Sequence, residues 1–130
     1  MIARIWTGRT KRRDAENYHE YVTRTGVTAL NGTPGNLGTW LLRRVDGETA
    51  EFTVISLWES METVRNFAGP ATEKAVYYPE DKRYLLELDP LVRHYEVLSK
   101  PERTIPSRPG EIRSRSGRTP SRRGTKSVGG

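Results

Sequence analysis

Two neighbouring segments of this sequence have the pattern of β-strands that are apolar on both faces. Residues 37–45 (LGTWLLRRV) and 50–58 (AEFTVISLW) flank an Asp-Gly pair, and this arrangement predicts a β-hairpin. The apolar side chains occupy both even and odd positions: Trp40, Leu41, Leu42, Phe52, Val54, Ile55, Leu57 and Trp58. A sheet with one face in water alternates apolar with polar residues instead. Both faces of the hairpin therefore need cover.

The other elements supply helices for one of these faces. The order of elements is β-α-β-β-α-β, which predicts an α+β, ferredoxin-like fold with a four-stranded antiparallel sheet. Both crossovers then place their helices on the same side of the sheet. The predicted elements outside the hairpin are a strand over 2–7, a helix over 11–30, a helix capped by Ser60, a helical segment over 71–77, a turn over 79–88 and a strand over 91–98.

The apolar residues on the second face of the sheet indicate that the protein associates with itself. The two crossover helices do not reach it, and a second copy that meets it sheet to sheet is the simplest partner. We therefore expect a homodimer in which two such sheets form a dimeric α/β barrel.

The charge of the chain divides it into two parts. Residues 1–98 contain 13 Lys/Arg and 14 Asp/Glu, whereas residues 99–130 contain 9 Lys/Arg and 2 Asp/Glu. The second part has two isoleucines, one valine and no aromatic residue, so it cannot bury enough apolar surface to offset the entropy of ordering. We predict a folded domain over 1–98 and a disordered basic tail over 99–130. This tail is either a solvated extension, which we favour, or a segment that contacts nucleic acid or another polyanion.

Several classes of site are excluded. The chain has no cysteine, so it has no disulfide, thiolate nucleophile or iron–sulfur site. The glycines of GTPGNLG (32–38) follow a helix and precede a strand, the reverse of a dinucleotide-binding loop. No stretch has the roughly 18–20 apolar residues of a membrane span. We expect a soluble cytoplasmic protein that does not bind a membrane.

A few side chains within 1–98 are candidates for chemistry. His94 falls on a strand face that can look toward the helices, where it would be either a base or a satisfied strand histidine. Arg4 is a charge on an apolar strand, so it must be paired, reach solvent or meet an acidic ligand group. Tyr77 and Tyr78 stand together before a proline. On helical spacing Tyr78 is the packed residue and Tyr77 the one that reaches a pocket.

The sequence resembles the antibiotic biosynthesis monooxygenase family of dimeric α/β-barrel proteins. The resemblance covers about residues 1–98. It rests on the order of elements, on the strand-to-helix junction SLWESMETVRNFA (56–68), and on EKAVYYPEDKRYLLEL after it. It implies a homodimer with a pocket in each subunit between the sheet and its helices.

The same resemblance implies a range of activities. Some family members oxidise aromatic polyketides to quinones with molecular oxygen and no cofactor, others degrade haem, and many have no known activity. The haem-degrading branch uses an Asn on the first strand with a Trp and a His, and the matching positions here carry Ile5, Phe67 and Tyr77. None of the three is kept. We expect no cofactor, with haem not favoured, although a tyrosine can ligate ferric haem.

Two functions follow as alternatives. One is a cofactor-independent monooxygenase, an oxidoreductase that oxidises a phenolic or polycyclic aromatic molecule with O2. The other is a non-catalytic dimeric barrel that binds a small apolar ligand. For the enzyme we predict catalytic positions at Tyr77, His94 and Trp58. For either function we predict ligand contacts from Tyr78, Phe67, Trp40, Arg4 and Tyr18. No metal site is predicted.

Overall fold

The computed structural model describes residues 1–100. Within them, Met1–Leu98 form one compact unit. Residues 101–130 lie outside the described part, and with them nearly all of the predicted basic tail and its possible contact with polyanions.

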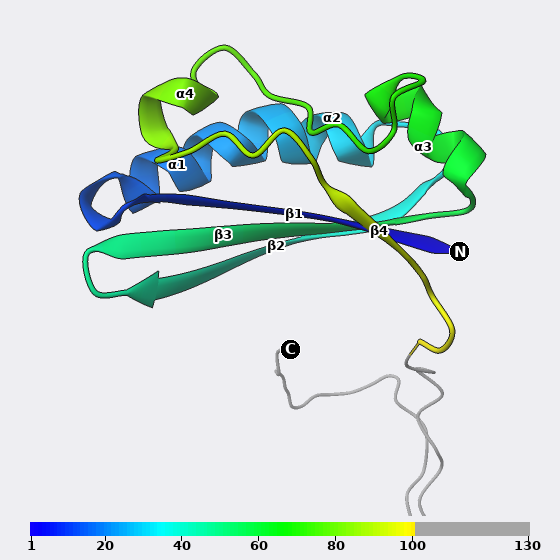
Figure 1. Ribbon diagram of the computed structural model, residues 1–130, viewed down its shortest axis with the longest axis horizontal. Helices are drawn as coiled ribbons and strands as arrows, with labels where there is room; N and C mark the ends of the chain where they lie inside the picture. Colours follow the sequence, from blue (N-terminus) through cyan, green and yellow to red (C-terminus); the bar gives the residue numbers. More distant parts are fainter. Residues whose placement is uncertain (101–130) are drawn as a thin grey trace, which may run out of the picture. The chain divides into compact units, whose positions relative to one another are not determined.

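The sheet has four antiparallel strands in the order β2-β3-β1-β4. Figure 1 shows the four strands as one layer. Their bounds are β1 (Ile2–Lys11), β2 (Asn36–Asp46), β3 (Thr49–Trp58) and β4 (Arg93–Glu96). The two helical crossovers join β1 to β2 and β3 to β4, so that β1 lies between β3 and β4 in the sheet. The predicted α+β, ferredoxin-like fold is confirmed.

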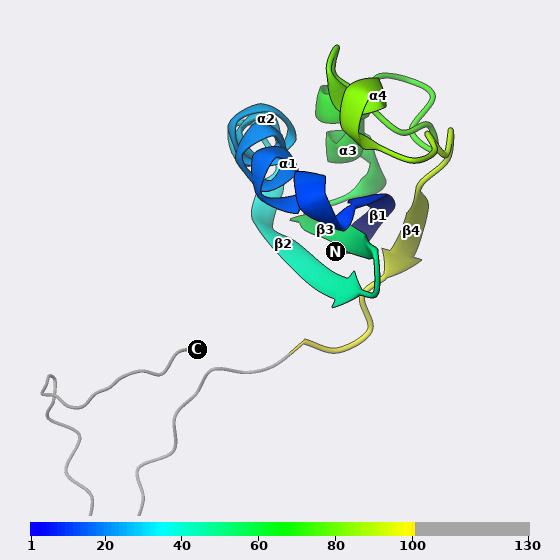
Figure 2. The same ribbon diagram turned by 90° about the vertical axis from the view of Figure 1, so that its left-hand side faces the viewer.

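All helices lie on one face of this sheet (Figures 1 and 2). They are α1 (Ala15–Val22), α2 (Thr28–Asn31), α3 (Met61–Ala68) and α4 (Asp81–Tyr84). Ser60 caps α3 as predicted, because its hydroxyl accepts from the Thr63 amide and the Thr63 hydroxyl accepts from the Ser60 amide. Among the described helices, none has the length and apolar character needed to cross a membrane.

The helix predicted over 11–30 is interrupted. A 3-10 turn over Arg12–Asp14 precedes α1, and a π-helical turn over Thr23–Val27 separates α1 from α2. Threonine hydroxyls in this stretch donate to backbone carbonyl oxygens: Thr23 to His19 and Thr28 to Thr23, both at 2.7 Å. Such bonds compete with the regular ladder, and the glycine within the turn has low helix propensity. The threonine hydrogen bonds and the glycine together account for the interruption of the helix.

The helical segment predicted over 71–77 is wrong. This stretch is a mixture of turns and extended chain between Pro70 and Pro79, and its backbone pairs with the chain that leads into β4. The Ala75 amide donates to the Pro90 carbonyl and the Val92 amide donates to the Glu73 carbonyl. Long-range pairing thus outweighs a weak local helical pattern. The helical-spacing argument that separated Tyr77 from Tyr78 does not apply.

The core lies between the sheet and the helices. Phe52, Val54 and Trp58 of β3 point toward the helices and are buried. On the opposite face, Trp40 and Leu42 of β2 remain exposed, at 52% and 47% of their surface. One face of the sheet is therefore covered by this chain and the other is not.

Candidate functional site

One pocket opens between the helix-bearing face of the sheet and the helices, and we call it the inner pocket. Its cavity volume is about 50 Å³. The inner pocket is thus a narrow slot. Five aromatic rings contribute to its wall: Trp6, Tyr18, Phe67, Tyr77 and Tyr78.

Trp6 and Tyr77 form a fixed pair in this wall. Their rings meet edge to face, with centroids 6.3 Å apart. The Trp6 indole N–H donates to the Tyr77 hydroxyl at 3.2 Å, and that hydroxyl donates to the Asp89 carbonyl oxygen at 2.6 Å. Burial raises the pKa of Tyr77. The Tyr77 hydroxyl is already hydrogen-bonded to Trp6 and to the Asp89 carbonyl oxygen. Tyr77 therefore contributes its ring, and not its hydroxyl, to the inner pocket.

Tyr78 differs from its neighbour. Its ring also lines the inner pocket, but its hydroxyl has no hydrogen-bond partner among residues 1–100. Burial raises the pKa of Tyr78 above its ordinary value, with the charge of Asp81 a smaller cause. Tyr78 is therefore the wall tyrosine whose hydroxyl is available to a ligand as a neutral donor.

Asp81 is a buried carboxylate in the same wall, at the first position of α4. It accepts a hydrogen bond from the Tyr18 hydroxyl at 2.9 Å and another from the Tyr78 amide at 2.6 Å. Burial, and then the charge of Asp81, raises the pKa of Tyr18. Sequence reasoning missed Asp81 because it lies in a run of mixed charge. Its place as an acidic residue in the first turn of a short helix was the available signal.

Three polar side chains form a row across the sheet. Arg4 of β1 is paired with Ser56 of β3 on one side and with His94 of β4 on the other. Directly opposed residues share a sheet face, so all three look toward the helices. The Arg4 guanidinium donates to the carbonyl oxygens of Thr72 at 2.6 Å and Lys74 at 3.0 Å. Burial lowers the pKa of Arg4 to about 10, so the side chain is charged at neutral pH.

His94 meets the inner pocket only through Arg4. Its Nε2 lies 3.1 Å from Nη1 of Arg4, and because arginine only donates, Nε2 must accept. The imidazole is then neutral, with its proton on Nδ1. Burial and the positive charge of Arg4 lower the pKa of His94, while the charge of Glu73 acts in the opposite direction. This arrangement makes His94 a support for Arg4.

The structure brings five of the eight predicted site residues together. Arg4, Tyr18, Phe67, Tyr77 and Tyr78 all line the inner pocket. Trp58 lies behind the wall, fully buried, with its ring centroid 6.3 Å from that of Phe67 and its indole N–H donating to Ser56 Oγ at 2.9 Å. Ser56, which sequence reasoning also missed, lines the inner pocket itself.

Trp40 is the clear departure from prediction. It is paired with Ile55, one position out of step with the pocket-facing Val54 and Ser56, and so it points to the uncovered face of the sheet. Within this subunit Trp40 does not contribute to the inner pocket.

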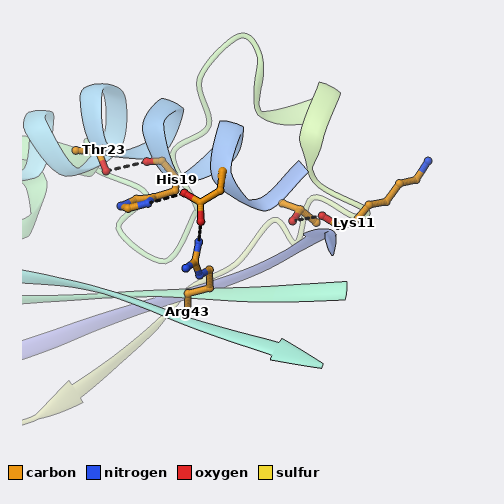
Figure 3. Close-up of polar contacts among 6 residues, drawn as sticks. Lys11, His19, Thr23 and Arg43 are labelled. Carbon is orange, nitrogen blue, oxygen red and sulfur yellow. Dashed lines mark hydrogen bonds and ion pairs between the residues drawn. The ribbon is translucent and has the colours of Figure 1, made fainter. Parts of the chain in front are cut away.

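His19, the second histidine, also lies away from the inner pocket. Figure 3 shows His19 on α1, with Arg43 of β2 near it. Glu16 accepts a hydrogen bond from Arg43 Nη1 at 2.7 Å. The imidazole Nδ1 is 3.7 Å from Glu16, and the two side chains are exposed. These contacts make His19 part of a surface charge cluster. Among residues 1–100 there is no group of three or more His, Cys, Asp or Glu side chains that could hold a metal ion.

Solved structures resemble this chain, whereas no protein-family model and no curated protein matches it. A candidate antibiotic biosynthesis monooxygenase from Bacillus cereus is 19% identical with a TM-score of 0.54, covering 78% of this chain and 96% of that one. The haem-degrading MhuD of Mycobacterium tuberculosis, with two haems in its active site, is 24% identical with a TM-score of 0.51 (78% and 100%). A point mutant of MhuD with two manganese protoporphyrin IX molecules per active site is 24% identical with a TM-score of 0.52 (78% and 99%).

The chain has the fold of these proteins. The resemblance to the antibiotic biosynthesis monooxygenase family is thereby confirmed at the level of the fold. One prediction is overturned. Two of the structures that share this fold hold haem or a metalloporphyrin, so the expectation of no cofactor, with haem not favoured, is wrong.

The residues of the inner pocket are chemically compatible with a porphyrin. Arg4 is a buried cation suited to a propionate group, and Tyr78 has a phenol hydroxyl of the kind that ligates ferric haem. The present slot is narrower than such a molecule needs. Its helical and loop walls would therefore have to separate from the sheet.

Proposed function

We propose that this chain is an oxygenase whose inner pocket binds a planar aromatic molecule and promotes its reaction with molecular oxygen. One observation carries the proposal: five aromatic rings line a single narrow slot, and polar groups project into it at a few points only. A mainly aromatic lining with a few polar groups is typical of small-molecule sites, and the slot would have to widen to admit a polycyclic ligand. The fold shared with a candidate monooxygenase is consistent with this activity.

The substrate class that we favour is a phenolic polycyclic compound. Such a molecule, once deprotonated at the ring, can give an electron to O2 and then form a carbon–oxygen bond. In the overall reaction a ring CH2 becomes a carbonyl, one oxygen atom enters the product and the other leaves as water. The chain would contribute water exclusion by the aromatic wall, the Tyr78 hydroxyl as a donor to the developing oxyanion, and the charge of Arg4.

Haem is a second candidate ligand. It is favoured by the MhuD structures that share this fold and hold haem or manganese protoporphyrin. Arg4 would hold a propionate and Tyr78 would offer its hydroxyl to the metal. A bound haem supplies iron that can activate oxygen. A third alternative is a protein that binds an aromatic ligand without turning it over.

We also propose that the chain forms a homodimer through the uncovered face of its sheet. Trp40, Leu42 and Tyr95 are exposed there, and Ile55 and Leu57 lie between them. An apolar patch of this kind on one face of a sheet is typical of a contact surface. The cytoplasmic location of the protein stays a prediction.

The proposed activity can be tested by oxygen uptake and by haemin titration. Purified full-length protein should accelerate oxygen consumption by anthrone or a hydroxyanthrone above the buffer rate, with formation of the anthraquinone. A shift of the haemin Soret band at equimolar protein would indicate the porphyrin alternative. Binding of anthrones without oxygen uptake, together with an unshifted Soret band, would contradict the oxygenase and favour the binding protein.

A matched pair of variants shows whether turnover occurs in the inner pocket. Tyr78→Phe keeps the ring and removes the hydroxyl that is free to meet a ligand. We expect its oxidation rate to fall by about 100-fold, the effect of losing one donor to a developing charge. Tyr95→Phe, on the uncovered face of the sheet, is the control and should keep the full rate. Equal rates for both variants would place the reaction elsewhere.

A further inference from the structure

Arg4 is a buried positive charge that no carboxylate neutralises. Its side chain lines the inner pocket, and the residue is only 4% exposed. None of the ion pairs among residues 1–100 includes it, and its contacts are two carbonyl oxygens, a neutral imidazole and the face of Phe67, whose ring centroid lies 5.6 Å from the guanidinium carbon. Buried charges in proteins are normally paired. The missing partner therefore indicates a ligand.

The guanidinium has donors left for that ligand. Nη1 donates to the Thr72 carbonyl oxygen and to His94, and Nη2 donates to the Lys74 carbonyl oxygen. Arginine carries five N–H donors, so the Nε–H and one N–H of Nη2 are without a partner among the described residues. These contacts hold the side chain in place and leave two of its N–H donors available to a ligand.

Ser56 adds a third donor beside Arg4. The two residues are directly opposed on β3 and β1, and both line the inner pocket. The Ser56 oxygen accepts from the Trp58 indole N–H at 2.9 Å, which orients the hydroxyl. Its own O–H proton has no acceptor among residues 1–100, although the residue is 1% exposed. A buried donor without an acceptor is costly unless a ligand supplies one.

We infer that Arg4 and Ser56 form a carboxylate subsite, so that the natural ligand of the inner pocket is a planar aromatic acid. The inference deepens the proposed function, because it concerns the same pocket and names the group that its ligand must carry. A carboxylate has two oxygens that can accept from the guanidinium and from the hydroxyl together. A phenol group alone is neutral at pH 7 and has one oxygen, so it would neither neutralise Arg4 nor accept from all of these donors. The phenolic substrate proposed above would therefore also carry a carboxylate.

The subsite can be tested with pairs of probes that share a ring system and differ in charge. Anthracene-2-carboxylate and 2-naphthoate are compared with their carboxamides by isothermal titration calorimetry on the full-length protein. The wild type should bind each carboxylate about 10- to 100-fold more tightly than the matching amide, as expected for charge-assisted hydrogen bonds in a buried site. A ratio near one, or no binding of any probe, would overturn the inference.

Three variants test whether Arg4 and Ser56 cause the preference for carboxylates over amides. Arg4→Gln should reduce the ratio of acid to amide affinity to about one while the amide still binds, and Arg4→Lys should give an intermediate ratio because it keeps the charge without the fork. Ser56→Ala should reduce the ratio a few-fold, and it remains informative if the Arg4 variants do not fold. Retention of the wild-type ratio in a folded Arg4→Gln protein would also overturn the subsite.

The test of the carboxylate subsite is independent of the test of the proposed oxygenase activity. Calorimetry reports binding alone, so the acid preference stands or falls whether or not oxygen is consumed. Oxygen uptake in the same preparations tests turnover. A protein that prefers acids and consumes no oxygen would contradict the proposed function and support the subsite.

Discussion

His94 shows how one side chain can be tied to the charge state of another. Its Nε2 must be unprotonated to accept from Arg4, and Arg4 keeps its charge at neutral pH. Protonation of His94 would replace that hydrogen bond with two positive charges 3.1 Å apart. The charged groups that act on the imidazole are Arg4, which disfavours protonation, and Glu73, which favours it.

We therefore predict that His94 makes the stability of the protein depend on pH. The pKa of His94 is lowered in the folded protein, first by burial and then by Arg4. As pH falls below about 6.5, the ordinary value, the unfolded chain takes up the proton before the folded protein does. The free energy of unfolding should thus be highest above pH 6.5 and should decline until the pH passes the folded pKa. Urea unfolding between pH 8 and pH 5 measures the decline.

A glutamine at this position is the control. His94→Gln can still accept from Arg4 through its amide oxygen but cannot titrate. Its unfolding free energy should vary less than that of the wild type between pH 7 and pH 5. His19 is present in both proteins, so the difference between their profiles comes from position 94. Identical pH profiles would show that His94 takes up its proton equally in the folded and unfolded states.

At the scale of elements, the segment between α3 and β4 forms one wall of the inner pocket and is held by Asp81. The Asp81 carboxylate joins this segment to α1 through Tyr18 and to its own backbone through the Tyr78 amide. Removing it leaves two donors without their acceptor in a buried environment.

Asp81→Ala should therefore lower the free energy of unfolding by about 2–4 kcal/mol, because hydrogen bonds to a charged group are lost and their donors stay buried. Tyr18→Phe, which removes one of these bonds and keeps the ring, should cost about 1–2 kcal/mol. Urea denaturation of both variants and of the double variant gives the coupling between the two side chains. Additive effects would mean that the hydrogen bond contributes nothing.

The elements themselves were predictable where the local pattern and the tertiary structure agree. The Asp-Gly turn fixed the hairpin of β2 and β3, and the Ser60 cap fixed the start of α3. Over 71–77 the local pattern was helical, but pairing with the chain before β4 prevailed. Contacts between residues distant in sequence also limited what could be predicted about the site. Strand alternation placed Arg4 on the same side as His94, whereas the proximity of Asp81 to Tyr18 depends on a contact 63 residues apart in sequence.

At the scale of the whole molecule, the two faces of the sheet differ in what covers them. The helices bury Phe52 and Val54, while Trp40 and Leu42 stay exposed on the reverse face. Apolar surface of this extent in one place favours association, because burying it releases free energy in proportion to its area. A dimer would also protect the sheet from contact with other chains.

The proposed homodimer yields the last prediction, which uses two positions on one strand. Leu42 is 47% exposed and opposes Thr53 on the uncovered face, whereas Val45 is 46% exposed and opposes Ala50 on the face that carries the helices. Leu42→Glu should convert the dimer to a monomer, because a carboxylate would be buried without a partner in the contact. Val45→Glu should leave the dimer intact. Sedimentation velocity at micromolar concentration distinguishes the two forms. A monomeric wild type, or equal effects of both substitutions, would contradict a dimer formed through this face.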